Sequence, residues 1–169
     1  MNRSNVVLIG MPGSGKSTVG VILAKRLGLD FVDSDLLIQA RAGRRLQQII
    51  AAEGMDALRR REEEVLLDLD RLEPAVIATG GSAVYSEPAM SALRRHSRIA
   101  FLDTPLEELE RRIEDMDERG LVLDPGESFA QLYARRQPLY RRYAEITVET
   151  AGLTAERVAA ELAARLERR

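Results

Sequence analysis

The sequence predicts an α/β fold in which helices flank a parallel β-sheet. Short, β-rich apolar runs alternate with longer segments of helical period, and this alternation is typical of βαβ units. A glycine-rich stretch, GMPGSGKST, joins the first run directly to the first helical segment. The five runs that we expect to form strands are NVVLIG (5–10), DFVDSD (30–35), AVIATGG (75–81), RIAFLD (98–103) and EITVET (145–150).

The chain has 169 residues, enough for one well-filled core and few for two. We therefore expect one domain, 1–169. With 45% apolar residues, 31% charged residues and a net charge of −2, the composition is that of an ordinary globular protein. Four Tyr, three Phe and no Trp leave little surface for stacking bases, and no apolar run could span a bilayer. We expect a monomer that binds neither nucleic acid nor membrane.

Cysteine is absent, which excludes disulfides and thiolate metal sites. The first residues, MNRSNVVLIG, do not resemble a secretory signal, because their apolar run is short and opens straight into the glycine-rich loop. Both observations are compatible with a reducing cytosol. We expect a cytoplasmic protein.

The helical segments carry start and stop signals. The segment from Lys16 to Leu27 ends at Gly28, and glycine commonly terminates helices. In TPLEELERRI, Thr104 is placed to cap a helix and Glu107 completes a capping box. These signals predict one helix after the first strand and another after the fourth.

Two further helices are expected near the end of the chain. Ser128 and Gln131 form a capping pattern at the start of SFAQLYARRQPLY. The last segment has an apolar stripe that predicts a closing helix packed on the sheet. The stripe consists of Ala155, Val158, Ala159, Leu162 and Leu166.

The segment from Asp115 to Glu127 separates two helical patterns and is irregular, polar and glycine-containing. It is too polar for the core and long for a simple connection. We expect it to form a mobile lid, at about 115–127.

The glycine-rich stretch matches the phosphate-binding pattern GxxxxGK[ST] at Gly10, Gly15, Lys16 and Ser17. Glycines let successive backbone N–H groups point into one concavity, and the helix that follows adds partial positive charge. Lysine supplies a full charge for the β- and γ-phosphates, and the serine hydroxyl can bind Mg²⁺. A plain connecting turn is the alternative, but the pattern and its strand-to-helix context favour a site for ATP and Mg²⁺. The expected nucleotide-binding residues are Gly13, Ser14, Gly15, Lys16, Ser17 and Thr18.

Two carboxylates follow in DFVDSD. On a strand, Asp33 and Asp35 would share a face and point from the carboxyl end of the sheet toward the phosphates. One could order Mg²⁺ through water and the other could hold an acceptor hydroxyl. The alternative is a helix cap beside a solvated aspartate.

These motifs resemble the shikimate kinase family over nearly the whole chain. The resemblance implies a three-layer P-loop kinase fold with a central five-stranded parallel sheet flanked by helices. It also implies transfer of the γ-phosphate of ATP to a hydroxyl of shikimate, a step in aromatic amino-acid biosynthesis that gives shikimate 3-phosphate. The family's D-x-D pair looks like Asp33 and Asp35, which implies water-mediated Mg²⁺ contact for the first and acceptor binding for the second.

The resemblance also implies roles for four arginines. GMDALRRRE (54–62) resembles the G-E-x-x-F-R-x-x-E segment and implies that Arg59 binds the substrate carboxylate, although Met55 and Leu58 replace Glu and Phe. RQPLY implies a second carboxylate ligand, Arg136. The lid arginine and the adenine-side arginine then correspond to Arg119 and Arg112, and the acceptor-binding helical segment spans about 35–62.

Two departures fall in segments that touch the substrate in the family. The family has three consecutive glycines where this chain has Gly80, Gly81 and Ser82, so a Cβ and a hydroxyl are added to the wall of the acceptor site. Gly120 replaces the lid proline, which removes a stiff residue. We expect Gly80, Gly81 and Ser82, which form the 80–82 turn, to bind the acceptor.

Considered without the resemblance, Arg59 and Arg136 have two possible roles: binding a carboxylate or forming a solvated helix face. A guanidinium pairs bidentately with a carboxylate, so two could fix a small acid in one orientation. Arg59 and Arg136 nevertheless lie in the charged stretches RRREEE and ARRQPLYRRY, where a solvated helix face is the usual arrangement. The sole histidine, His96, is expected at a surface helix end.

The expected chemistry is in-line phosphoryl transfer from Mg·ATP to an alcohol of a small carboxylate-bearing molecule. Lys16 and Arg119 neutralise charge on the transferring group, while Asp35 orients the hydroxyl. A related kinase acting on homoserine or a sugar acid is the main alternative. A nucleotide-binding regulatory module without transfer and a nucleoside monophosphate kinase are weaker ones.

Overall fold

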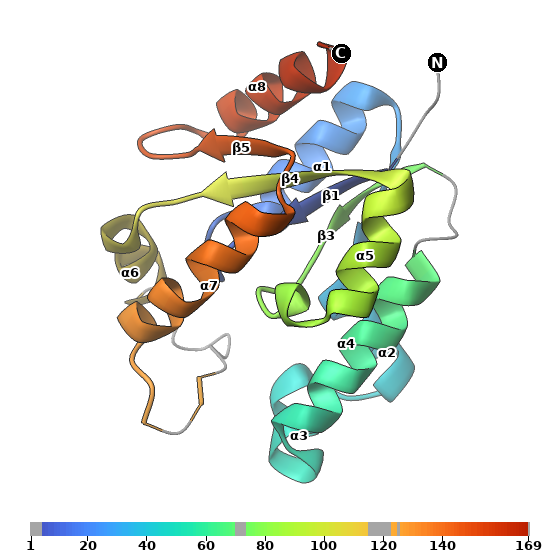
Figure 1. Ribbon diagram of the computed structural model, residues 1–169, viewed down its shortest axis with the longest axis vertical. Coiled ribbons are helices and arrows are strands. Elements are labelled where there is room, and N and C mark those ends of the chain that lie inside the picture. The colour runs from blue at the N-terminus through green and yellow to red at the C-terminus, as the bar shows by residue number, and fades with distance from the viewer. Residues whose placement is uncertain (1–4, 70–73, 115–122, 125, 169) are drawn as a thin grey trace.

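The computed structural model describes residues 5–69, 74–114, 123, 124 and 126–168 (Figure 1). Its centre is a five-stranded, all-parallel sheet with the strand order β2-β3-β1-β4-β5. All five predicted strands are confirmed. They are β1 (Asn5–Ile9), β2 (Asp30–Asp33), β3 (Ala75–Ala78), β4 (Ser97–Asp103) and β5 (Ile146–Glu149).

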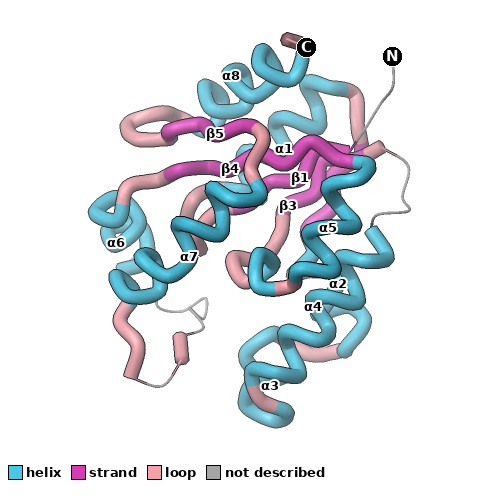
Figure 2. Tube along the Cα trace, viewed as in Figure 1, coloured by secondary structure: helices cyan, strands magenta, loops and turns pink. Residues whose placement is uncertain are grey.

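Helices cover both faces of the sheet, which gives three layers (Figures 1 and 2). On one face lie α1 (Lys16–Leu27) and α8 (Ala155–Glu167). The other face is covered by α4 (Met55–Leu69), α5 (Glu87–His96) and α7 (Phe129–Tyr143), with α2 (Ser34–Ala42) and α3 (Leu46–Glu53) packed around α4. The remaining helix, α6 (Leu106–Glu114), follows β4. The predicted α/β class is confirmed.

The central strand β1 contributes to both cores because its side chains alternate between the two faces. Val6 and Leu8 pack with α1 and α8, whereas Val7 and Ile9 pack with the helices of the opposite layer. All residues of β1 are buried. A continuous apolar run is therefore stable here, because no face of the strand meets water.

The predicted helix signals are mostly confirmed. The first helix ends at Gly28, whose φ of +64° lies in the left-handed region. Ser128 and Gln131 form the expected reciprocal capping box of α7. The capping box at Thr104 is wrong, because α6 begins at Leu106 and the Thr104 hydroxyl instead bonds that of Thr150 at 2.6 Å.

The closing helix packs as its apolar stripe predicts, with Val158, Ala159 and Leu162 buried against the sheet. Most of the predicted lid, including Arg119 and Gly120, lies outside the described residues. Among the described residues, no helix is long and apolar enough to cross a membrane.

The sheet topology places one region for ligand binding. The strand order reverses at β1, and in α/β sheets ligands bind beyond the carboxyl ends of strands at such a point. The glycine-rich loop follows β1, and the 80–82 turn follows the neighbouring strand β3. Both candidate segments therefore lie at the same edge of the sheet.

Candidate active site

The loop between β1 and α1 has the shape that a phosphate site requires. Gly10 and Gly15 have φ values of +150° and +87°, which other residues rarely adopt. A Cβ on Gly10 would also lie 2.9 Å from the carbonyl oxygen of Leu102. Gly15 is the N-cap of α1, so the loop ends at a helix N-terminus, where partial positive charge favours an anion.

Lys16 folds back over this loop. Its Nζ donates to the carbonyl oxygens of Gly10 and Met11, each at 2.8 Å, and to Ser14 Oγ at 3.4 Å. Burial lowers the pKa of Lys16 from 10.5 to about 8, although the charge of Asp35 opposes this shift. The Lys16 ammonium therefore remains largely charged at pH 7, and its hydrogen bonds to the loop carbonyls fix its position.

Asp33 and Asp35 do not share a strand, which corrects the sequence expectation. β2 ends at Asp33, and Asp35 lies in the first turn of α2. Asp33 caps that helix, because its Oδ1 accepts from the backbone N–H of Asp35 at 3.0 Å and of Leu36 at 3.4 Å. Its Oδ2 accepts from Ser17 Oγ at 2.6 Å. The helix-cap alternative is thus correct for Asp33, and the same carboxylate also reaches the phosphate loop.

Asp35 is a partly buried carboxyl close to the loop. Burial raises its pKa from 3.8 to about 6; the charge of Asp33 adds to this shift, and Lys16 opposes it. Asp35 is therefore mostly ionised at pH 7 and can accept a hydrogen bond from an alcohol.

The turn after β3 brings these groups close to a second set of charges. A Cβ on Gly80 would lie 2.4 Å from Glu62 Oε1 and 2.9 Å from Asp35 Oδ1. A Cβ on Gly81 would lie 2.7 Å from a terminal nitrogen of Arg136. A side chain at Gly80 or Gly81 would therefore displace one or more of these charged groups.

Glu62 is a site residue that sequence reasoning did not single out. It is only 4% exposed, and Ser82 Oγ donates to its Oε2 at 2.5 Å. Burial raises the pKa of Glu62 from 4.5 to about 7, and the Ser82 hydrogen bond counteracts part of that shift. The charged stretch RRREEE conceals this role, although Glu62 ends the GMDALRRRE segment and lies four residues from both Leu58 and Leu66, on the apolar face of α4.

Tyr140 fixes the 80–82 turn from the other side. Its buried hydroxyl donates to the carbonyl oxygen of Gly81 at 2.7 Å. Its ring stacks on Phe101 of β4, with centroids 5.1 Å apart. The RQPLY segment thus contributes Arg136 to the site and Tyr140 to the support of the turn.

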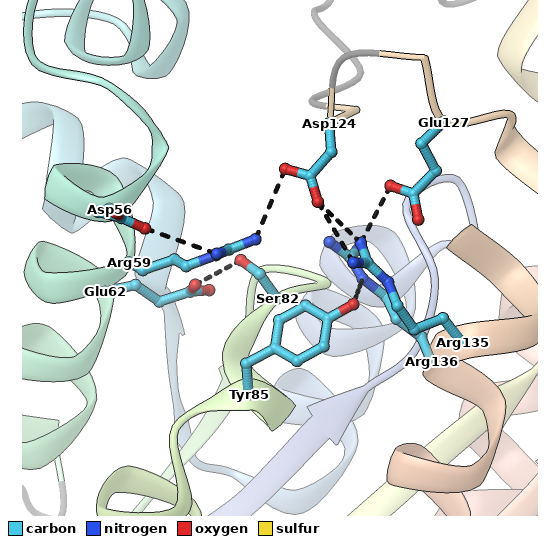
Figure 3. Close-up of polar contacts among 9 residues, drawn as sticks. All are labelled: Asp56, Arg59, Glu62, Ser82, Tyr85, Asp124, Glu127, Arg135 and Arg136. Carbon is cyan, nitrogen blue, oxygen red and sulfur yellow. Dashed lines mark hydrogen bonds and ion pairs between the residues drawn. The ribbon is translucent and has the colours of Figure 1, made fainter. Parts of the chain in front are cut away.

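Arg59 and Arg136 approach the same aromatic ring (Figure 3). Their guanidinium carbons lie 5.5 and 5.3 Å from the centroid of Tyr85, within cation–π range. Arg136 is 5% exposed, and its Nε donates to the Tyr85 hydroxyl at 3.3 Å. Arg59 is more open, and its Nη2 lies 3.7 Å from a carboxylate oxygen of Asp124. Arg135 contacts the other oxygen of Asp124 at 3.2 Å.

Arg112 lies against the outer side of the phosphate loop. Its Nη1 donates to the carbonyl oxygen of Gly13 at 2.9 Å, and it also pairs with Glu108 one turn earlier in α6. This position is beside the loop rather than within the cavity described next.

A cavity of about 380 Å³ connects the phosphate loop to the 80–82 turn. Met55 and Leu58, the two replacements in GMDALRRRE, contribute apolar lining together with Ile38 and Leu46. Of the predicted site residues within the described ranges, Ser14, Asp33, Arg59 and Arg112 do not line it. Those that do are Gly13, Gly15, Lys16, Ser17, Thr18, Asp35, Gly80, Gly81, Ser82 and Arg136, joined by Glu62.

Comparisons with known proteins match this chain to the shikimate kinases. The model of the shikimate kinase family matches residues 12–167. A shikimate kinase of Symbiobacterium thermophilum is 40% identical over 169 residues, covering 98% of this chain and 97% of its own. A shikimate kinase of Tolumonas auensis is 37% identical over 163 residues, covering 95% of each chain. The solved shikimate kinase of Acinetobacter baumannii in complex with shikimate has a TM-score of 0.88 and 34% identity, covering 98% of this chain and 96% of that one.

Proposed function

Because the chain belongs to the shikimate kinase family, we propose that it transfers the γ-phosphate of ATP to a hydroxyl of shikimate. The observation that carries this proposal is the shared cavity, in which the phosphate loop faces Asp35 and Arg136 across one space. A donor phosphate held by the loop and an acceptor held by the opposite wall would meet there. The product is shikimate 3-phosphate, which contributes to aromatic amino-acid biosynthesis.

The loop from Gly13 to Thr18 binds the ATP phosphates in this proposal. Backbone N–H groups and the start of α1 supply partial positive charge, and Lys16 supplies a full one. Lys16 already lies over the loop through its bonds to Gly10 and Met11. Arg112 is assigned to the adenine side, because it is tied to Gly13 on the outer surface of the loop.

The pair of Ser17 and Asp33 fits a magnesium ion. Both offer oxygen atoms, the ligands that Mg²⁺ prefers, and they already lie within 2.6 Å of each other beside the loop. Within the described residues, no three His, Cys, Asp or Glu side chains gather to form a metal site. A site with few protein ligands suits Mg²⁺, which usually keeps several waters and binds substrate phosphates. When bound, the ion would neutralise charge on the phosphates.

Asp35 and Arg136 hold the acceptor. Ionised Asp35 accepts a hydrogen bond from the reacting hydroxyl and orients it toward the phosphate. A strong base is not needed, because the transition state of phosphoryl transfer is loose. The buried guanidinium of Arg136 pairs with the acceptor carboxylate, and the glycines at 80 and 81 allow close approach of the backbone.

Arg59 is proposed as the second carboxylate ligand. Its Nε is buried and has no hydrogen-bond partner among the described residues, so one donor is available. Tyr85 holds it near Arg136. Asp124 lies against Arg59 in this structure, and a substrate carboxylate would replace that weak contact. Arg119 is assigned to the transferring phosphate only through the family resemblance.

We further propose a single, monomeric, cytoplasmic domain. A lid at about 115–127 and an acceptor-binding segment at about 35–62 complete the assignment. The acceptor-binding segment is supported by the position of α2, α3 and α4 beside the cavity, since all three helices contribute lining residues.

A coupled assay of ADP release tests the function directly. Shikimate, homoserine and gluconate are supplied in turn at matched concentrations with Mg·ATP. We expect kcat/KM for shikimate to exceed the others by at least about 100-fold, the discrimination expected when buried polar partners would otherwise be left unpaired. Preference for homoserine or gluconate would establish the alternative kinase, and ADP release independent of any alcohol would refute acceptor phosphorylation.

A further inference from the structure

Ser82 is linked by its side chain to a buried carboxyl group of the cavity wall (Figure 3). Its Oγ donates to Glu62 Oε2 at 2.5 Å, joining the turn after β3 to helix α4. The backbone of Ser82, with φ −87° and ψ −6°, lies in the ordinary right-handed region. A glycine is therefore not required here, and the serine adds a hydroxyl without backbone strain.

Contacts at both carboxyl oxygens restrict the position of the Glu62 side chain. Oε2 is held by Ser82, while Oε1 is buried and has no hydrogen-bond partner in the described part of the chain. Gly80 leaves only enough room for Oε1, because a Cβ there would lie 2.4 Å away. A buried carboxylate with a single hydrogen bond depends strongly on that bond.

The charges around Glu62 come from three other elements. Arg136 of α7 and Lys16 at the start of α1 favour its ionised form, whereas Asp35 of α2 disfavours it. Tyr140 of α7 also faces this group. In return, ionised Glu62 helps to keep Lys16 charged against the repulsion of Arg136. Glu62 thus balances two cations that share one cavity.

We propose that Ser82 is a positioning residue for the kinase reaction, acting through Glu62: its hydroxyl favours the ionised form of that carboxylate and orients it between Lys16 and Arg136. This proposal rests on the proposed function for its kinetic consequences. Its structural part, the control of Glu62 by Ser82, stands on the hydrogen bond and the charges alone. Ser82→Ala shifts Glu62 toward its protonated form at neutral pH, and Lys16 then loses part of the negative charge that supports its ammonium.

The chain provides a matched control one turn away. Ser86 Oγ donates to Glu63 Oε2, also at 2.5 Å, but neither residue lines the cavity. Ser86 also caps α5 by accepting from the N–H of Ala89. Ser86→Ala therefore breaks an equivalent serine–glutamate bond and lowers stability, without touching the charges of the site.

The first experiment follows the ionisation of Glu62 without using activity. The δ-carbon of Glu62 is titrated by ¹³C NMR in wild type, Ser82→Ala, Ser82→Thr and Ser86→Ala, with Glu62→Gln identifying the signal. Loss of a hydrogen bond to a charged group is expected to raise the midpoint by about one pH unit in Ser82→Ala. Ser82→Thr and Ser86→Ala should keep the wild-type midpoint. An unchanged midpoint in Ser82→Ala overturns the proposal, and Ser82→Gly is the substitute if that variant does not fold.

The second experiment measures kcat/KM for shikimate against pH. A one-unit rise from about 7 predicts that Ser82→Ala loses about eightfold at pH 6.5 and less than about 1.5-fold at pH 8.5. Ser82→Thr should restore the profile. An equal loss at every pH indicates a merely structural role and contradicts the proposal. If the NMR midpoint shifts but wild type does not phosphorylate shikimate, the proposed function fails while the control of Glu62 by Ser82 stands.

Discussion

The hydroxyl of Ser17 donates to Oδ2 of Asp33 at 2.6 Å, joining the first turn of α1 to the end of β2. Asp33 at the same time caps α2, the helix that carries Asp35. A single carboxylate therefore links the phosphate loop to the acceptor side of the cavity. A substitution of Asp33 that keeps a capping oxygen should therefore change the Mg²⁺ requirement without unfolding α2.

Asp33→Asn retains the side-chain oxygen that caps α2 but removes the charge. We expect the Mg²⁺ concentration for half-maximal activity to rise by about 10- to 100-fold, as for other indirect metal contacts. Thermal unfolding should change little. Asp30→Asn, at the exposed opposite end of β2, is the control. An unaltered Mg²⁺ requirement in Asp33→Asn means that Asp33 serves only as a helix cap.

Lys16→Ala should abolish phosphoryl transfer and leave the fold intact. The ammonium is the charged group that lies over the phosphate loop, and its loss is expected to reduce kcat by at least about 100- to 1,000-fold. Circular dichroism should match wild type, because the loop shape depends on glycines. The melting temperature should fall modestly, because the hydrogen bonds of Lys16 to the carbonyl oxygens of Gly10 and Met11 are lost. Near-normal turnover with a normal fold is the result that excludes Lys16 from the chemistry.

Lysine substitutions test whether Arg59 and Arg136 bind the substrate carboxylate, because lysine keeps the positive charge but has a different shape. Arg59→Lys and Arg136→Lys lose the planar guanidinium, so acceptor binding should weaken by about 1 to 3 kcal/mol at each position. KM for ATP should barely change. Arg60→Lys, next to Arg59 but exposed, should alter acceptor binding by less than about 0.5 kcal/mol. Equal, small effects at all three positions would show that the acceptor is bound elsewhere.

Arg135, the neighbour of Arg136 in sequence, is a poor choice as a control for Arg136→Lys. It pairs with Asp124 and Glu127 and lies 5.4 Å from the centroid of Tyr85. A substitution there would disturb the surroundings of Arg59 through Asp124. The sequence places Arg135 on a basic helix face, but these tertiary contacts come from the described end of the 115–127 segment.

The sequence predicts the fold well because its signals are local. Apolar runs bounded by glycine or aspartate specify the strands, and Gly28 and Ser128 specify helix boundaries through backbone geometry. The phosphate loop is equally local, since its glycines and Lys16 lie within seven residues. The misassigned Thr104 cap shows the limit of such signals, because a tertiary hydrogen bond to Thr150 occupies that hydroxyl.

The acceptor side is less predictable because it depends on contacts between distant segments. Asp35 belongs to a helix that starts one residue after β2, which a strand-like alternation does not reveal. Glu62 is buried only because α4 packs beside the 80–82 turn. In sequence it is one of several charged residues in RRREEE, and only its four-residue spacing from Leu58 and from Leu66 separates it from its more exposed neighbours.

Asp35→Asn should change the pH dependence of stability. The folded-state pKa of Asp35, about 6, exceeds its ordinary value of 3.8, so the native state holds the proton more tightly between these values. The wild-type free energy of unfolding therefore falls as pH rises from about 4 to about 6. Asn has no such loss, so the variant should gain about 2 to 3 kcal/mol relative to wild type between pH 3.5 and pH 8. Urea unfolding at both pH values measures this, and a pH-independent difference contradicts the raised pKa.

The central claim is that phosphate passes from ATP to a hydroxyl of shikimate within one cavity. The most direct measurement is ³¹P and ¹H NMR of a reaction containing the protein, Mg·ATP and shikimate, with Lys16→Ala as the control. The account predicts one new phosphate monoester, at the 3-hydroxyl, for each ADP formed, and none with Lys16→Ala. Release of inorganic phosphate in step with ADP, or unreacted shikimate after ATP is consumed, would contradict it.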